Sequence, residues 1–177
     1  MSTLSPKDKA KQIKLLALDV DGTLTSGLIY YGPEGKEWRG FHVQDGLGIK
    51  LLQRVGIIVA IISAKRSESV LQRLNELKIE NYYLGQNDKR IAYDDIKNKF
   101  GLKDEHIAYM GDDLPDLPLL RRAGFSITLP DAPTLIKQQA DWVSSRQAGM
   151  GAVREACEFI LTAQNQYDAV MSSYLTL

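Results

Sequence analysis

Short apolar runs alternate with amphipathic segments along most of this chain, and this alternation restricts the fold more than any other feature. Short apolar runs suit strands buried on both faces, and amphipathic segments suit helices that cover a sheet. We expect strands at 13–19, 57–62, 82–84, 107–110 and 125–129, and helices at 46–55, 67–78, 89–100, 113–123, 133–140 and 151–164. The pattern predicts an α/β fold with a Rossmann-like, doubly wound parallel sheet.

Length and charge limit the organisation further. The chain has 177 residues, which predicts a single domain over 1–177 with a polar N-terminal tail at 1–12 and a C-terminal tail at 165–177. Lys plus Arg and Asp plus Glu both number 22, so the overall charge favours neither nucleic acid nor a membrane surface as a partner. The polar first dozen residues lack the apolar segment of a signal peptide, and no later apolar run approaches a membrane span. We therefore expect a cytoplasmic protein.

The single cysteine, Cys157, is expected to be a packed thiol. Its neighbours Val153, Ala156 and Ile160 indicate the apolar face of a helix. With one cysteine, neither a disulfide within the chain nor a cysteine zinc site is possible.

Two β-rich runs interrupt the alternation and predict a hairpin at 27–43. Gly32-Pro33-Glu34-Gly35 lies between the runs and is typical of a turn. The runs carry the aromatic residues Tyr30, Tyr31, Trp38 and Phe41. These rings either pack on the parent domain or become buried in a subunit interface, because an isolated hairpin is marginally stable in water.

Asp19-Val20-Asp21-Gly22-Thr23 follows the apolar run that ends at Leu18. Two carboxylates at the carboxyl end of a strand converge on the crevice where open α/β sheets bind ligands. Like charges this close raise one pKa or are neutralised by a divalent cation, and both outcomes indicate a reactive site. The alternative is an acidic turn, because Asp-Gly is common turn chemistry.

Two further polar residues each follow a predicted strand. The hydroxyl of Ser63 could bind an anion at the start of the next helix, although a serine here is more often a helix N-cap. Lys89 falls in the first turn of a predicted helix, where the helix dipole opposes a cation, so an anionic partner would explain it. The alternative for Lys89 is a solvated surface lysine.

Gly111-Asp112-Asp113-Leu114-Pro115-Asp116 brings three carboxylates to the end of another predicted strand. Such a group suits a hard cation such as Mg²⁺, which binds through one or two carboxylates. Asp also caps helices, so we assign a structural role to Asp116 or Asp113 before Asp112.

These four motifs, in this order, resemble those of the haloacid dehalogenase superfamily phosphatases. The resemblance implies that Asp19 is the nucleophile that forms an aspartyl-phosphate, and that Asp21 is the general acid and base. It implies that Asp19, the backbone carbonyl of Asp21 and Asp112 bind Mg²⁺, the implied cofactor, with Asp113 and Asp116 in support. Ser63 and Lys89 would bind the phosphoryl oxygens as members of the catalytic set.

The spacing between the motifs leaves no room for an inserted cap domain, so something else must cover the site. Over nearly its whole length the chain resembles the 3-deoxy-D-manno-octulosonate 8-phosphate (KDO 8-phosphate) phosphatases. In that family, hairpins and C-terminal tails of neighbouring subunits in a homotetramer cover the site. The resemblance implies hydrolysis of a sugar-acid phosphate, KDO 8-phosphate, in lipopolysaccharide precursor synthesis.

The matching stretches carry the residues that the resemblance places at the substrate. They are Gly27 to Tyr30, Phe41 to Gly46, Gly85 to Lys89 and Gly151 to Glu155. The implied substrate-binding residues are Asp21, His42, Val43, Gln44, Asp45, Gly46, Lys50, Lys65, Arg73 and Lys89.

Three stretches of the chain depart from the family pattern. The family usually has arginine where this chain has Gln44, a Gly-Arg pair where it has Ala64-Lys65, and Gly-Gly-Arg-Gly where it has Ala148 to Gly151. Lysine supplies charge but lacks the planar fork that suits a carboxylate. Either Arg66 compensates, or the preferred substrate is another sugar phosphate such as a nonulosonate 9-phosphate.

Two alternatives belong to other functional classes. A non-catalytic oligomerisation module would be expected to lack the acid/base or metal residues, all of which are present here. A signalling receiver domain places its phospho-acceptor on a central strand apart from the acidic pair, whereas the run 57–62 ends in Ser63 without an aspartate.

Overall fold

The fold is built around one six-stranded parallel sheet with the strand order β5-β4-β1-β6-β7-β8. The computed structural model describes residues 4–175. The strands of this sheet are β1 (Leu15–Leu18), β4 (Ile58–Ser63), β5 (Asn81–Leu84), β6 (Ile107–Met110), β7 (Phe125–Thr128) and β8 (Trp142–Val143). The predicted α/β class is confirmed.

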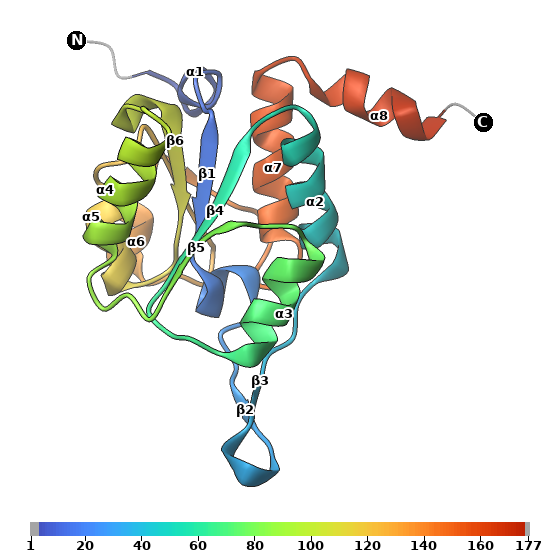
Figure 1. The fold of residues 1–177 in the computed structure, drawn as a ribbon. Helices are drawn as coiled ribbons and strands as arrows, with labels where there is room; N and C mark the ends of the chain where they lie inside the picture. The colour runs from blue at the N-terminus through green and yellow to red at the C-terminus, as the bar shows by residue number, and fades with distance from the viewer. Residues whose placement is uncertain (1–3, 176–177) are drawn as a thin grey trace.

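Helices cover both faces of the sheet (Figure 1). The helices are α1 (Pro6–Ala10), α2 (Val43–Arg54), α3 (Glu68–Glu76), α4 (Lys89–Lys99), α5 (Leu117–Leu120), α6 (Thr134–Gln139), α7 (Ala152–Ala163) and α8 (Tyr167–Leu175). One face packs against α2, α3 and α7, and the other against α4, α5 and α6. The sheet therefore separates two hydrophobic cores, as in a doubly wound fold.

Strand β1 shows why the short apolar runs became central strands. Leu16 and Leu18 belong to the core under α2 and α7, while Leu15 and Ala17 belong to the core under α4 and α5. Successive side chains of a strand point to opposite faces, so a strand covered on both sides must be apolar at every position. Cys157 is fully buried in the first core, which confirms the packed thiol.

Some elements differ from the prediction. The helix predicted at 113–123 is a short 3-10 turn, Leu114–Asp116, followed by the four-residue α5, because Pro115 and Pro118 lack the N–H that a continuous helix needs. Strand β8 was not predicted, because two residues are too few for a recognisable pattern. The predicted tails, 1–12 and 165–177, extend beyond the described residues, and their described parts contain α1 and α8.

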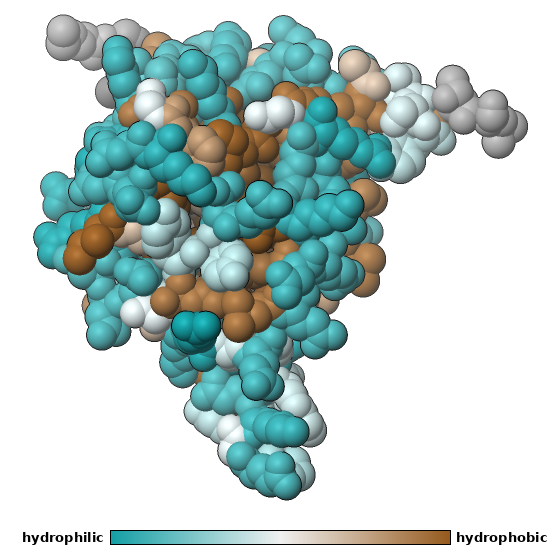
Figure 2. Space-filling model, in the orientation of Figure 1, coloured by the Kyte–Doolittle hydropathy of each residue, from teal (hydrophilic) through white to brown (hydrophobic). Residues whose placement is uncertain are grey.

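The predicted hairpin is present, between β1 and α2, with β2 (Tyr30–Tyr31) pairing antiparallel with β3 (Glu37–Trp38). It projects as a narrow arm from the edge at which the parallel strands end (Figures 1 and 2). Tyr30, Tyr31 and Trp38 are exposed in the single chain, and only Phe41 packs against the main core. Within residues 4–175 no helix is both long and apolar enough to span a bilayer.

Candidate active site

The polar residues that follow the strands meet at one edge of the sheet. Asp19 directly follows β1, Ser63 ends β4, Lys89 begins α4 after β5, and Asp112 follows β6 by one residue. Strand β1 lies between β4 and β6, so these carboxyl ends are adjacent. They line a cavity of about 260 Å³. Its lining residues are Asp19, Asp21, Ser63, Ala64, Lys65, Lys89, Asp112, Asp113, Pro115 and Asp116.

Lys89 is buried and joins two of the carboxylates. Its Nζ donates to Asp19 Oδ1 and to Asp116 Oδ1, both at 2.5 Å, and the residue is 3% exposed. Of the two interpretations of this lysine, the structure excludes the solvated one. The carboxylates compensate for the unfavourable position of Lys89 in the first turn of α4.

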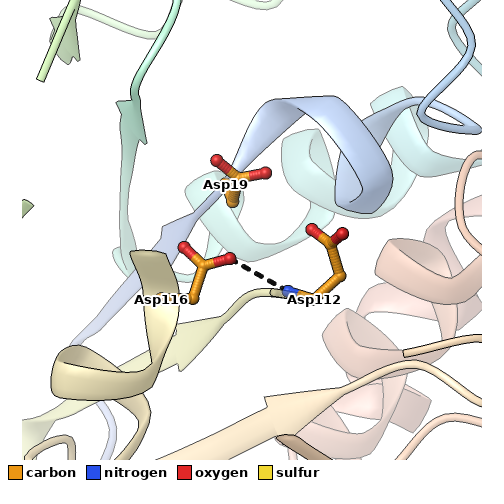
Figure 3. A group of neighbouring side chains, drawn as sticks. All are labelled: Asp19, Asp112 and Asp116. Carbon is orange, nitrogen blue, oxygen red and sulfur yellow. Dashed lines mark hydrogen bonds between the residues drawn. The ribbon is translucent and has the colours of Figure 1, made fainter. Parts of the chain in front are cut away.

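Asp113 and Asp116 hold the loop after β6 in place. Asp116 Oδ1 accepts from the Tyr109 hydroxyl at 2.5 Å, and its Oδ2 accepts from the backbone N–H of Asp112 at 3.1 Å (Figure 3). Asp113 accepts from the N–H of Leu114 at 2.8 Å and caps the 3-10 turn. Both oxygens of Asp116 are therefore engaged by protein donors, in agreement with the structural role expected for it.

Asp19, Asp112 and Asp116 converge so that one carboxylate oxygen of each lies within 4.8 Å of the others (Figure 3). Burial, and next the charge of Asp116, raise the pKa of Asp19 to about 8. Burial, and again Asp116, raise the pKa of Asp112 to about 6. Lys89 offsets only part of this negative charge, so the group fits a hard divalent cation held by oxygen ligands.

Gly22 lets Asp112 approach the turn that carries the acidic pair. Its φ is +96°, and a Cβ at this position would lie 2.2 Å from Asp112 Oδ2. The Thr23 hydroxyl donates to Asp112 Oδ1 at 3.1 Å and fixes the other oxygen. The Asp21-Gly22-Thr23 segment is therefore more than an acidic turn, because Gly22 and Thr23 contact the side chain of Asp112.

Ser63 is not a helix cap. It is buried at the end of β4, and its Oγ accepts from the backbone N–H of Lys65 at 3.3 Å. The next helix, α3, begins later and is capped by Ser67, which accepts from the N–H of Val70 at 3.3 Å. The hydroxyl of Ser63 thus lies in the wall of the cavity, whereas the side chain of Lys65 is at its exposed rim.

Asp21 is held by a residue that the sequence did not indicate. Arg39, just after β3, donates from Nε to Asp21 Oδ1 at 2.6 Å and from Nη2 to Asp21 Oδ2 at 3.3 Å. Its Nη1 lies 3.0 Å from Glu37 Oε2. No local pattern distinguishes Arg39 from a solvated hairpin arginine, because its partner comes from a distant turn.

Several predicted substrate-binding residues lie outside this cavity in the single chain. Asp45 is buried and accepts from the N–H groups of Arg154 at 2.7 Å and Gly151 at 3.3 Å, which places it at the start of α7. Arg73 Nη2 donates to the carbonyl of His42 at 3.1 Å. Gln44 is exposed and lines a separate hollow with Arg146 and Arg154.

The remaining predicted substrate-binding residues lie in α2 or directly before it. His42 precedes α2 and has an intermediate exposure, while Val43 in its first turn is 81% exposed. Gly46 packs closely on Arg73, because a Cβ there would lie 2.3 Å from Arg73 Nη2. Lys50 is exposed on α2. Their roles at a substrate stay predictions.

Comparisons of this sequence with known proteins agree on one family. A sequence profile of haloacid dehalogenase-like hydrolases matches residues 85–157. The 3-deoxy-D-manno-octulosonate 8-phosphate phosphatase of Escherichia coli K12 is 43% identical over 160 residues, which are 90% of this chain and 85% of that protein.

Solved structures agree. The 3-deoxy-D-manno-octulosonate 8-phosphate phosphatase of Moraxella catarrhalis, in complex with magnesium, phosphate and KDO, superimposes with a TM-score of 0.93 at 46% identity, covering 96% of this chain and 97% of that one. The cobalt-bound deoxy-D-mannose-octulosonate 8-phosphate phosphatase of Haemophilus influenzae gives 0.90 at 38% identity, covering 95% and 99%. Identity of this extent, together with the acidic cavity at the strand ends, shows that the chain belongs to the haloacid dehalogenase-like hydrolases and, within them, to the 3-deoxy-D-manno-octulosonate 8-phosphate phosphatase family.

Proposed function

We propose that this chain is a Mg²⁺-dependent phosphatase that hydrolyses a sugar-acid phosphate, with KDO 8-phosphate as the first candidate substrate. The observation that carries the proposal is the contact of the buried Lys89 with Asp19 beside Asp112, in one cavity. A nucleophilic carboxylate that attacks a phosphate dianion needs positive charge at the point of attack. The relatives' activity on KDO 8-phosphate supports the choice of substrate.

The reaction requires two transfers at phosphorus. In the first, Asp19 forms a bond to phosphorus while the bond to the sugar oxygen breaks, and Asp21 protonates the leaving oxygen. In the second, Asp21 accepts a proton from water, the water oxygen bonds to phosphorus, and Asp19 is released.

Residues that line the cavity supply positive charge and hydrogen bonds. Lys89 opposes the rise in the pKa of Asp19 and, with Ser63, would bind phosphoryl oxygens. Asp19, the Asp21 carbonyl and Asp112 would hold Mg²⁺, which supplies charge neutralisation at the phosphoryl oxygens when bound. Asp116 supports this set by positioning Lys89 and the loop of Asp112.

The residues expected at the sugar part of the substrate depart from the family pattern. Gln44, Lys65 and Met150 stand where the family usually has arginines, so contacts to the acid group of the sugar differ. Each lost charged hydrogen bond weakens binding by about 1–3 kcal/mol. Arg66, exposed beside the cavity-lining Lys65, is the residue expected to compensate.

We also propose a homotetramer in which neighbouring subunits cover the cavity. The exposed rings of Tyr30, Tyr31 and Trp38 on the projecting hairpin support this assembly, since clustered exposed aromatic residues are typical of interaction surfaces. Leu175 at the end of α8 is also exposed and offers further apolar surface to a neighbouring subunit. Light scattering of the intact protein, and of a variant with Tyr31→Ser and Trp38→Ser, tests it: a monomeric, fully active wild type would contradict it.

The activity is tested by Mg²⁺-dependent phosphate release from KDO 8-phosphate, a nonulosonate 9-phosphate and common sugar phosphates. Asp19→Asn serves as the blank. Preference for KDO 8-phosphate supports the substrate as proposed, and preference for another ester moves the assignment to that ester. Absence of turnover on all of them would favour a binding module, and a long-lived phosphoryl-aspartate after acetyl phosphate treatment would favour a receiver domain.

A further inference from the structure

Arg39 is a buried cation in an otherwise exposed hairpin. Its side chain has no exposed surface, whereas Tyr31 and Trp38 on the same hairpin are 71% and 54% exposed. A buried guanidinium is stable only when it is paired and hydrogen-bonded. The identity of its partners therefore indicates its purpose.

Both partners of Arg39 are carboxylates. Nε donates to Asp21 Oδ1 at 2.6 Å and Nη2 to Asp21 Oδ2 at 3.3 Å, while Nη1 lies 3.0 Å from Glu37 Oε2. Glu37 belongs to the same hairpin, so it anchors the guanidinium to its own strand. Asp21 belongs to the turn after β1, so the two-pronged contact links the hairpin to the acidic pair.

We propose that Arg39 is a positioning residue for the proposed acid and base: its two-pronged contact holds the carboxyl group of Asp21 in one orientation in the cavity. The inference rests on the function proposed above and adds a residue to it. The two hydrogen bonds from one buried guanidinium carry the proposal, because they engage both oxygens of Asp21. A guanidinium fork also restricts rotation of the carboxylate, which a single ammonium contact would not.

The proton balance gives Arg39 a defined part in each step. In the first step Asp19 bonds to phosphorus, the ester P–O bond breaks, and the proton on Asp21 passes to the oxygen of the leaving alcohol. In the second step the water oxygen bonds to phosphorus, a proton of that water passes to Asp21, and the bond from Asp19 to phosphorus breaks. Arg39 keeps the carboxyl group of Asp21 in the same orientation in both steps.

An alkyl ester, KDO 8-phosphate, and an aryl ester, p-nitrophenyl phosphate, distinguish this role from a purely structural one. A sugar alkoxide is a poor leaving group and needs the proton, whereas p-nitrophenolate leaves without one. General acid catalysis contributes about 10²–10⁴-fold to a rate. A residue that acts through the acid must therefore affect the alkyl ester far more than the aryl ester in the first step.

The experiment compares wild type, Arg39→Met and the control Lys36→Met by rapid-quench and stopped-flow kinetics with Mg²⁺. Lys36 is an exposed cation of the same hairpin. For Arg39→Met we expect single-turnover cleavage of KDO 8-phosphate to fall at least about 30-fold, and the p-nitrophenol burst to fall by less than about threefold. Lys36→Met is expected to leave both rates within about twofold, because an exposed charge contributes little.

A double-variant cycle tests whether Arg39 acts through Asp21. If Arg39 acts through Asp21, adding Arg39→Met to Asp21→Asn leaves the single-turnover rate on KDO 8-phosphate unchanged within about twofold, because residues acting as a unit are not additive. If Arg39→Met does not fold, Arg39→Lys takes its place, because it keeps the charge but loses the fork and is expected to show the same unequal loss.

Each outcome has one meaning. Equal losses on both esters, no loss on either, or full additivity with Asp21→Asn would overturn the role of Arg39. Failure of the wild type itself to hydrolyse any ester would instead overturn the proposed function. If the wild type prefers another alkyl phosphate, that ester replaces KDO 8-phosphate in the same comparison.

Discussion

The ammonium group of Lys89 lies 2.5 Å from a carboxylate oxygen of Asp19, and both groups are almost fully buried. Removing one partner of a buried pair leaves the other charge uncompensated, which destabilises a protein by about 3–5 kcal/mol. We therefore expect Lys89→Met to lower the free energy of unfolding by that amount and to lower kcat at least about 100-fold. Urea denaturation and phosphate release measure the two effects.

The control for this prediction is Lys97→Met on the same helix. Lys97 Nζ lies 3.1 Å from Asp104 Oδ1 at a partly exposed site, where an ion pair contributes about 0–1 kcal/mol. Equal destabilisation by both substitutions would contradict the importance assigned to the Lys89 contacts.

Asp19→Asn is expected to separate activity from stability. Removing the nucleophile abolishes turnover, but Lys89 keeps Asp116 as a charged partner, and the crowding of Asp19, Asp112 and Asp116 is relieved. In EDTA the variant should be as stable as the wild type or more stable by about 1–2 kcal/mol, that is, a Tm higher by about 2–8 °C. Mg²⁺ should raise the Tm of the wild type more than that of Asp19→Asn. Scanning calorimetry with EDTA and with Mg²⁺ checks this, and a large Tm loss in EDTA would refute it.

Gly22→Ala should displace Asp112. The new Cβ would lie 2.2 Å from Asp112 Oδ2, and the φ of +96° adds backbone strain. We expect the apparent Mg²⁺ affinity, measured by activation of phosphate release, to fall at least about 10-fold. Gly56→Ala is the matched control, because its φ is +83° but no atom lies within 4 Å of its Cβ. If both variants lose Mg²⁺ affinity equally, the close contact with Asp112 is not the cause.

Asp45 is expected to stabilise the start of α7. Because it accepts from the N–H groups of Gly151 and Arg154, Asp45→Ala should lower the free energy of unfolding by about 1–2 kcal/mol. Asp45→Asn keeps an accepting oxygen and should retain most of this stability. Urea denaturation of the two variants tests the difference, and identical stability of wild type, Asn and Ala would be incompatible with the cap.

The lowered pKa of Glu155 predicts that the free energy of unfolding depends on pH. Burial acts to raise its pKa, but hydrogen bonds from Ser144 and Ser145 outweigh burial and lower it. A carboxyl with a lowered folded pKa stabilises above its unfolded pKa and loses this contribution as pH falls through the folded value. Glu155→Gln should therefore be less stable than wild type by about 1 kcal/mol at pH 7, after allowance for partial exposure, with a smaller difference at pH 4.

Urea denaturation at both pH values checks the Glu155 prediction. Glu158→Gln is the control on the same helix, since it removes only a partly exposed pair with Arg154. A difference between Glu155→Gln and wild type that grows as the pH falls would have the wrong sign.

The fold and the acids at the strand ends could be predicted because they depend on local patterns. A strand buried on both faces must be apolar throughout, as β1 is, and parallel topology then brings Asp19 and Asp112 together. The contact of Arg39 with Asp21 could not be predicted, because the direction of the hairpin is set by packing and not by its own sequence. The same holds for Asp45, whose partners lie in α7, far along the chain.

The small volume of the acidic cavity has a consequence for how such enzymes diversify. At about 260 Å³ it is below the range of roughly 300–1,000 Å³ typical of ligand pockets, so one chain encloses little beyond the phosphate end of an ester. Changes at Gln44 or Met150 can then accumulate without disturbing Asp19 and Lys89. Duplicated copies of such a gene would then acquire new substrates through single exchanges of exposed residues, while Asp19, Lys89 and the other cavity residues stay unchanged.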